Sequence, residues 1–511
     1  MSRSVIAIGL DAADPTLIEK WEEEGHLPVL NRLKKQGAYT LLDNFEFTKA
    51  ETPWTTVLTG CAPEKTKFWG PIRFCGKTYN VLEDQKASYD FKQYGQFYAL
   101  GEEYRVAVFD VPHSKLAENV NGIQVLGWGA HSPFCPSHSD PPALYQELVA
   151  RHGEHPAFLK DHADPCRPDM LAWLEGALVE GIKRRRDICI DLANRERWSL
   201  FLMTFGESHS GGHVFYHLGQ PDHPLYGLVK MPTGDPLLRI YKAIDSAIGE
   251  ILSHLPEDVM VIIFSAHGME ANNLDVPSLI FLPELMYRFA FPGKVALGGN
   301  AKGAKIGPPI IDRNGLFMRE WPAGLHFPSE LRNQKDSLWW SPAQWYKRSW
   351  PRMKAFALPS YADGAVRINL AGRESQGMVP REQYDQFCAE VAEVIAGLKD
   401  ARTGKPVVKD VLRVRDAATA DDPELPEADL IVIWENEPVT DVVEHAALGR
   451  IGPVPYLRTG AHRPYGFLNI VGPGVTPGGS LPRGHALDIT PTILSLMGAK
   501  IPHHLDGKPL V

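Results

Sequence analysis

A recurring pattern constrains the fold of this chain more than any other feature: apolar segments that each end, within a few residues, in an acidic residue or a histidine. The segments read "SVIAIGLDAAD", "YRVAVFDVP", "WSLFLMTFGES" and "DVMVIIFSAHGM". Near-continuous runs of Val, Ile, Leu and Phe that alternate with helical segments are typical of a parallel sheet covered on both faces. The sequence therefore predicts an α/β fold with a mostly parallel sheet flanked by helices.

Polar residues stand where these strands are expected to end. Asp11, Glu207, His209 and His267 each follow an apolar run. Ligands of such sheets bind just beyond the carboxyl ends of the strands. We therefore expect these four side chains to gather at one edge of the sheet.

A histidine repeat follows the third apolar run. The stretch "FGESHSGGHVFYH" places His209, His213 and His217 four residues apart, so the three rings can lie along one face of a helix. The consecutive glycines Gly211 and Gly212 weaken a helix interior and favour a loop that runs into a helix.

Zinc is the ion that this pattern favours, because a catalytic zinc ion takes three protein ligands and leaves a fourth position open. His209 and His213 supply two nitrogen atoms. His267 in "FSAHGM" and His462 in "TGAHRPYG" are candidates for the third ligand, and Asp11 is a candidate oxygen ligand. Each histidine taken alone is more often an ordinary hydrogen-bonded residue, but their shared position at predicted strand ends favours a metal site.

Composition narrows the range of partners. The 511 residues are 44% hydrophobic and 23% charged, as in an ordinary globular protein, with a net charge of -9. This modest charge argues against nucleic acid or an anionic membrane as the main partner. Six cysteines without a CxxC pair indicate reduced thiols, and the N-terminal apolar run is too short for a secretory signal or a membrane span. We expect a cytoplasmic protein that acts on a small molecule.

The chain is expected to divide into a core in two parts, an inserted cap and a small α/β subdomain, with "ADLIVIWEN" as a further core strand. The cap is predicted from a stretch rich in Gly, Pro, Trp and Lys without clear periodicity. In the subdomain, Arg373 can offer its guanidinium to an anionic substrate or form a buried ion pair with Glu374. The expected bounds are 1–291 for the first part of the core, 292–353 for the cap, 354–425 for the subdomain and 426–511 for the closing part.

Five motifs occur in a specific order: "IGLDAADPTLIEKWEEEGHLPVLNRLKKQGA", "ETPWTTVLTGCAPEKTKFWG", "GESHSGGH", "FSAHGM" and "HRPYGFLNIVGPGV" with "DITPTIL". Together they resemble the alkaline phosphatase superfamily, and most of all its type I phosphodiesterase/nucleotide pyrophosphatase branch. The resemblance implies an alkaline-phosphatase-like sheet that carries two zinc-type ions at its edge and a Thr or Ser that attacks a phosphoryl group. In that family a D-x-x-x-H pair and a distant histidine hold one ion. Here the corresponding residues are His209, His213 and His462.

The second metal position departs further from the family pattern. Its ligands in the family are the first-strand aspartate and a consecutive Asp-His pair, which correspond here to Asp11, Ala266 and His267. The loss of a carboxylate lowers both the charge and the number of ligands. We therefore expect one tightly bound zinc ion and a weak or empty second site.

The attacking group stays open at this point. The family's nucleophile position, ten residues before the Gly of "TG", falls on Ala50. Thr48 and Thr52 lie on either side of it, and Thr52 is the candidate nucleophile, although both threonines can equally stabilise the following helix. Metal-bound water is the alternative attacker. Glu207 and Glu51 are candidate general bases or partners that orient a ligand histidine.

The favoured interpretation is a zinc-dependent hydrolase of the phosphodiesterase/nucleotide pyrophosphatase type that acts on a phosphate ester or anhydride of a small molecule. An alternative is a single-zinc, three-histidine enzyme that acts on another bond in small-molecule or natural-product metabolism, such as an ester, an amide or an elimination. A degenerate binding module ranks last, because intact histidines in three separate segments are hard to explain without a metal.

Overall fold

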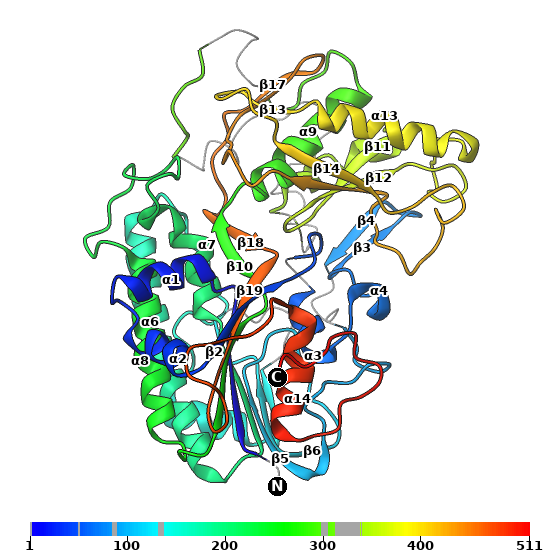
Figure 1. Cartoon of the computed structure of the whole chain (residues 1–511). Helices are drawn as coiled ribbons and strands as arrows, with labels where there is room; N and C mark the ends of the chain where they lie inside the picture. The colour runs from blue at the N-terminus through cyan, green and yellow to red at the C-terminus, as the bar shows by residue number, and fades with distance from the viewer. Residues whose placement is uncertain are drawn as a thin grey trace.

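A mixed sheet, ten-stranded in the described part of the chain, forms the larger of the two bodies of the molecule (Figure 1). The computed structural model describes residues 3–49, 52–83, 89–130, 137–297, 305–311, 338 and 340–511. The strands of this sheet are β1 (Val5–Leu10), β2 (Ala38–Asp43), β5 (Gly101–Phe109), β6 (Val120–Leu126), β7 (His138–Asp140), β8 (Leu200–Phe205), β9 (Met260–Ser265), β19 (Tyr465–Val471), β20 (Gly479–Ser480) and β21 (Gly484–His485).

The centre of this sheet is parallel. Strands β9, β1, β8, β5 and β6 are neighbours in that order, and each pair runs in the same direction. Strand β19 is antiparallel to both β9 and β2, and β7 is antiparallel to β6. The predicted mostly parallel sheet is therefore confirmed, and the apolar runs found in the sequence are its central strands.

Alternation along the strands explains why these runs are apolar throughout, since successive side chains point to opposite faces. All six residues of β1 are buried. On one face of the sheet, Ile6 and Ile8 pack with a first group of helices. On the other face, Val5 and Ala7 pack with a second group. The first group is α1 (Pro15–Glu23), α2 (Pro28–Gln36), α6 (Pro168–Arg195), α7 (Glu207–Gly219) and α8 (Pro236–Ser253); the second is α3 (Pro53–Thr59) and α14 (Ile489–Met497).

A smaller antiparallel sheet forms the second body, in the order β11-β12-β15-β14. Its hydrophobic core also takes in side chains of α9 and α13 and of the β3–β4 hairpin. None of the described helices is both long and apolar enough to cross a membrane. The elements named here are β3 (Ile72–Cys75), β4 (Asn80–Glu83), β11 (Ala355–Leu358), β12 (Gly364–Ile368), β14 (Val408–Arg413), β15 (Leu430–Trp434), α9 (Leu282–Ala290) and α13 (Tyr384–Ala396).

One sequence expectation changes here. The segment "ADLIVIWEN" was expected in the core sheet, but β15 pairs antiparallel with β12 and β14. A fully buried apolar strand fits either sheet, so the pattern alone does not decide between them. Trp345, Tyr346 and Trp350 of the expected cap are buried in the core of the small body. Residues 298–304, 312–337 and 339 of this stretch lie outside the described residues, and both a lid and the four-part division of the chain remain predictions.

Candidate metal centre

Helix α7 carries His209 and His213 without interruption. The expected loop between them is wrong, because the helix begins at Glu207 and continues through both glycines. A β-carbon on Gly212 would lie 2.3 Å from the sulfur of Met269, and one on Gly211 would lie 2.9 Å from a methyl carbon of Ile240. The glycines therefore let neighbouring elements pack closely against the helix, and this packing offsets their poor helix propensity.

Two short strands bring His462 to the same place. Strand β10 (Gly268–Ala271) pairs antiparallel with β18 (Gly460–Arg463), and the register sets His462 opposite Met269. The backbone amide of Thr459, just before β18, donates to the carbonyl of His213, 2.8 Å away. Strand β18 is therefore tied both to the segment after β9 and to helix α7.

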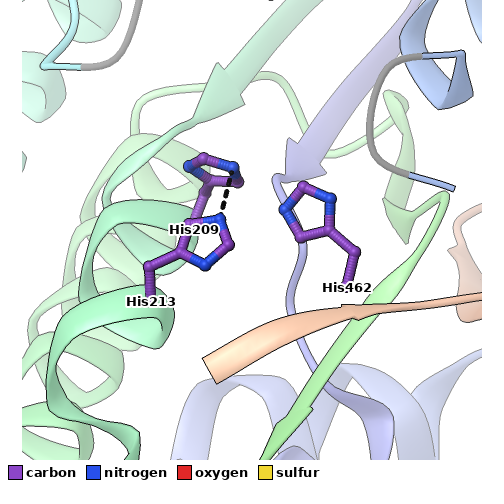
Figure 2. A group of neighbouring side chains, drawn as sticks. All are labelled: His209, His213 and His462. Atoms are coloured by element: carbon purple, nitrogen blue, oxygen red, sulfur yellow. Dashed lines mark hydrogen bonds between the residues drawn. The ribbon is translucent and has the colours of Figure 1, made fainter. Parts of the chain in front are cut away.

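The side chains of His209, His213 and His462 converge in a buried group (Figure 2). One ligand atom from each lies within 4.8 Å of the other two. The Nε2 atoms of His209 and His213 are 3.2 Å apart. Two nitrogen ligands of a tetrahedral zinc ion, each about 2.0–2.1 Å from the metal, are separated by about 3.4 Å. The spacing therefore suits a zinc ion.

The hydrogen bonding of His213 also suits a metal ligand. Its Nδ1 atom donates to the carbonyl of Gly460 over 2.7 Å, which leaves the lone pair of the neutral ring on Nε2. A ligand histidine commonly donates its other ring nitrogen to a carbonyl or carboxylate, and this bond sets the tautomer and orients the ring. The Nε2 atom of His213 faces His209, as such a ligand requires.

Asp11 and His267 lie next to this group. The centroids of the His267 and His462 rings are 4.7 Å apart, and His267 Nε2 is 3.7 Å from Asp11 Oδ1. The same oxygen accepts a hydrogen bond from Trp54 Nε1 over 2.8 Å. Burial lowers the pKa of His267 to about 3, so its ring is neutral, as a metal ligand must be.

Ala266, which directly precedes His267, offers no side-chain ligand, and its backbone carbonyl accepts a hydrogen bond from Asn44 Nδ2. The second position thus has two donor groups, Asp11 and His267, among the candidates that the sequence pointed to. This is fewer than the three protein ligands of a usual catalytic zinc site.

His217, the third histidine of the repeat, lies apart from the group. Its Nδ1 is 3.1 Å from the hydroxyl of Thr459, and its ring centroid is 5.8 Å from that of His223. Burial lowers the pKa of His217 to about 4. Each step of four residues turns a side chain by about 40° around an α-helix, so two steps carry His217 away from the face of His209.

Glu207 points into a buried cluster of charges. Both carboxylate oxygens accept from Arg185 Nε, at 3.0 and 3.1 Å, and one lies 3.2 Å from His155 Nε2. Arg185 also pairs with Asp110 over 2.8 Å. Burial alone would raise the pKa of Glu207, but Arg185 and His155 bring it below its ordinary value. A role as general base stays a prediction, and these contacts favour a structural role.

Thr52 is the residue at the N-terminal end of α3. Its side chain makes no capping hydrogen bond; its hydroxyl donates instead to the carbonyl of Thr48 over 2.9 Å. The side-chain capping bond is therefore absent, while a role of Thr48 and Thr52 in stabilising the helix stays a prediction. Trp54, in the first turn of α3, donates to Asp11, so this turn lies against the edge of the sheet where β1 ends. Ala50 and Glu51 lie outside the described residues, and the proposed role of Glu51 stays a prediction.

A pocket of about 290 Å³ opens between the two bodies. Thr48 and Trp69 line it from the large body, and Tyr361 and Asp363 line it from the small one. The amide of Thr48 donates to the Asp363 carboxylate over 3.2 Å, and Lys49 pairs with the same carboxylate over 3.0 Å. The loop that carries the candidate nucleophile therefore contributes a wall of this pocket.

Arg458 was not among the residues that the sequence singled out. It pairs with Asp275 through two contacts, and its Nη1 lies 3.1 Å from His213 Nε2. Its position four residues before His462, in "LRTGAH", was the available sequence signal.

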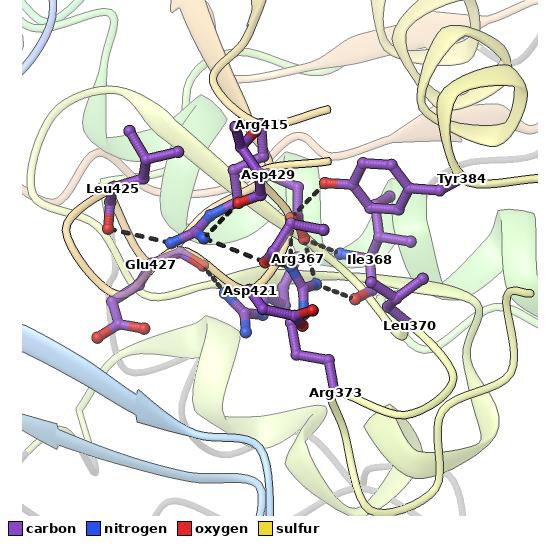
Figure 3. A network of polar contacts seen from close by, with 12 residues as sticks. Arg367, Ile368, Leu370, Arg373, Tyr384, Arg415, Asp421, Leu425, Glu427 and Asp429 are labelled. Atoms are coloured by element: carbon purple, nitrogen blue, oxygen red, sulfur yellow. Dashed lines mark hydrogen bonds and ion pairs between the residues drawn. The ribbon is translucent and has the colours of Figure 1, made fainter. Parts of the chain in front are cut away.

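Arg373 belongs to a buried polar network in the small body (Figure 3). Its guanidinium donates to both oxygens of Asp429 at 2.7 Å and to Glu374 at 2.9 and 3.1 Å. Arg367 donates to Glu374, and Tyr384 donates to Asp429. Of the two roles considered for Arg373, the structure shows the buried ion pair.

Three comparisons relate the chain to known proteins. A model of the type I phosphodiesterase/nucleotide pyrophosphatase family matches residues 5–438. Among curated proteins no significant match is found. A structure of phosphonoacetate hydrolase from Sinorhizobium meliloti with phosphonoformate is 13% identical, with a TM-score of 0.51 over 98% of this chain and 96% of that one. A structure of human ectonucleotide pyrophosphatase/phosphodiesterase 5 is 11% identical, with a TM-score of 0.50 over 98% and 96%. At these identities the two structures show a shared fold.

Proposed function

This chain belongs to the type I phosphodiesterase/nucleotide pyrophosphatase family, and on that premise we propose that it hydrolyses a phosphate ester or anhydride of a small molecule with the help of one zinc ion. His209, His213 and His462 would hold the ion. The observation that carries the proposal is the convergence of these three buried rings. They come from distant parts of the chain: His213 and its hydrogen-bond partner Gly460 are 247 positions apart in the sequence.

The donor set and its surroundings fit zinc. Three neutral imidazoles with one open position form the ligand set of a hydrolytic zinc ion. The hydrogen bond from His213 to Gly460 orients that ring in advance. A zinc ion held here would act as a Lewis acid on a phosphoryl oxygen and as an activator of water. Asp11 and His267 would form a weak second site or none.

Thr52 is the proposed attacking group. Its hydroxyl is not used to cap α3, and its bond partner Thr48 lines the pocket between the two bodies. A substrate held in this pocket would therefore lie next to the loop of Thr52. Water is the competing attacker, and replacement of Thr52 by alanine distinguishes the two.

Elemental analysis of the purified protein is the first test. We expect one zinc ion per chain in the wild type and none in His209→Ala. His217→Ala is the matched control, because this buried histidine lies on the same helix outside the group. The control should keep its zinc. If His209→Ala retains the ion, or if His217→Ala alone loses it, the assignment of the ligands fails.

The same samples test the reaction. The wild type and His217→Ala should hydrolyse a bis-aryl phosphodiester, and His209→Ala should not. A wild type with two zinc ions per chain would show that Asp11 and His267 build a working second site. A wild type without zinc would refute the proposed enzyme and favour the binding module.

A second candidate function rests on the second metal position. Ala266 contributes no side-chain ligand there, so Asp11 and His267 alone would have to hold the second ion of a two-metal clamp on a phosphoryl group. A single-zinc enzyme that cleaves an ester or an amide would need no such clamp. This candidate predicts a zinc-loaded protein that leaves the phosphodiester intact and hydrolyses aryl carboxylic esters instead.

A further inference from the structure

Arg458 contacts both the histidine group and the backbone of a residue that lines the pocket. Its Nη1 lies 3.1 Å from Nε2 of His213, the nitrogen that faces His209. Its Nη2 lies 3.3 Å from the carbonyl oxygen of Tyr361, a residue of the pocket wall. The side chain is 26% exposed. The guanidinium therefore lies between the histidine group and one residue of the pocket wall.

Asp275 holds this guanidinium in a defined orientation. Arg458 Nε donates to Oδ2 over 2.6 Å, and Nη2 donates to Oδ1 over 2.8 Å. The carboxylate is 2% exposed. Because the guanidinium is planar, a pair made through Nε and Nη2 leaves Nη1 directed toward His213. A zinc ion bound to Nε2 would take the lone pair that this donor faces, and Nη1 would then be available to a ligand beside the ion.

The charge at this site also calls for a cation. Asp11 and His267 supply two donor groups to the second metal position, and Ala266 supplies none. In a two-metal site the second ion stabilises an oxygen of the group that is transferred. With that ion weakly held or absent, another positive charge is needed beside the first metal. A guanidinium suits this purpose, because its N–H donors match the oxygens of a phosphoryl group.

We propose that Arg458 binds an anionic phosphoryl oxygen of the substrate next to the three-histidine centre and so supplies the positive charge that a second metal ion would otherwise provide. Asp275 is the positioning residue that orients it. This inference rests on the proposed function, since it assumes a phosphoryl substrate.

Binding of inorganic phosphate to the zinc-loaded protein tests this role without turnover. Isothermal titration calorimetry compares the wild type with Arg458→Gln and Arg458→Lys. Arg402→Gln is the matched control, because Arg402 pairs with Asp441 through the same two atoms at 2.7 and 2.8 Å and is 31% exposed. Zinc content is determined on every sample.

The expected result is a rise in the Kd for phosphate of about 10- to 100-fold in Arg458→Gln, the range for loss of a charge-assisted hydrogen bond. Arg458→Lys should lose less, since it keeps the charge without the planar fork. Arg402→Gln should bind as the wild type does, and all four proteins should hold the same zinc. Equal phosphate affinity in the wild type and Arg458→Gln overturns the inference, as does an equal loss in Arg402→Gln or the absence of phosphate binding in the wild type.

The two proposals fail separately. A zinc-loaded wild type that binds phosphate through Arg458 but leaves the phosphodiester intact refutes the proposed function alone, whereas an active, zinc-loaded wild type whose phosphate affinity equals that of Arg458→Gln refutes this inference alone.

Discussion

Replacement of Glu207 by glutamine separates a catalytic base from a buried structural carboxylate. The side chains of Glu207 and Arg185 are fully buried, and Arg185 Nε donates to both oxygens of Glu207. Glutamine keeps the shape and one acceptor oxygen but removes the charge. A general base would lose its chemistry with this change, whereas a structural carboxylate would lose mainly stability.

The size of the expected loss follows from the remaining contacts. Net, a hydrogen bond to a charged group contributes about 1.5–3 kcal/mol. Asp110 stays 2.8 Å from Arg185 in the variant and balances its charge, so the full cost of about 3–5 kcal/mol for an uncompensated buried charge does not arise. We expect Glu207→Gln to lower the free energy of unfolding by about 2 kcal/mol. Arg185→Met, which leaves two buried carboxylates without their cation, should cost about 3–5 kcal/mol.

Urea denaturation and kinetics on the same preparations measure both effects. The urea concentration at the unfolding midpoint should be highest for the wild type, lower for Glu207→Gln and lowest for Arg185→Met. The kcat of Glu207→Gln toward a bis-aryl phosphodiester should stay within about tenfold of the wild-type value. Because the pKa of Glu207 is lowered in the folded protein, its stabilising contribution is present above the pKa of the unfolded chain and is lost as the pH falls. The gap between the wild type and Glu207→Gln should therefore narrow in acid. A fall in kcat of about 100-fold or more with an unchanged midpoint would refute this reasoning and identify Glu207 as the base.

Three further changes test other parts of the structure. Burial raises the pKa of Asp14 to about 7, so the free energy of unfolding of the wild type should fall by up to about 4 kcal/mol as the pH rises from 4 to 7. Asp14→Asn can still cap α1 and should show no such fall. Parallel pH profiles of stability for the two proteins would contradict this. Gly212→Ala places a β-carbon 2.3 Å from the sulfur of Met269 and should cost about 1–3 kcal/mol in urea denaturation, less in a Met269→Ala background; equal costs in both backgrounds would exclude this clash as the cause. Thr52→Ala should lower kcat for the phosphodiester by at least about 100-fold with zinc retained, whereas a kcat within tenfold would point to water as the attacker.

The central sheet and the neighbourhood of its carboxyl edge follow from sequence pattern. Continuous apolar runs bury both faces of a strand, and the residues after β1 and β9 must emerge at one edge because parallel strands end together. For this reason Asp11 and His267 were expected near each other, and they lie 3.7 Å apart. The same logic failed for β15, since a buried strand of five residues carries no mark of the sheet that it joins.

Which histidines meet, and what lies beside them, was decided by tertiary structure. His209, His213 and His217 are alike in spacing, but the pairing of β10 with β18 brings His462 to the first two only. Arg458 gains its place through Asp275, 183 positions away in the sequence.

Tertiary packing also decides that helix α7 continues through Gly211 and Gly212. Local propensity disfavours it, yet close contact with Ile240 and Met269 leaves no room for larger residues. The spacing of apolar residues along the chain indicates which side chains are buried, because the geometry of each helix or strand fixes which of its side chains share a face. Contacts between distant segments depend on how those elements pack, and no local pattern in the chain encodes that packing.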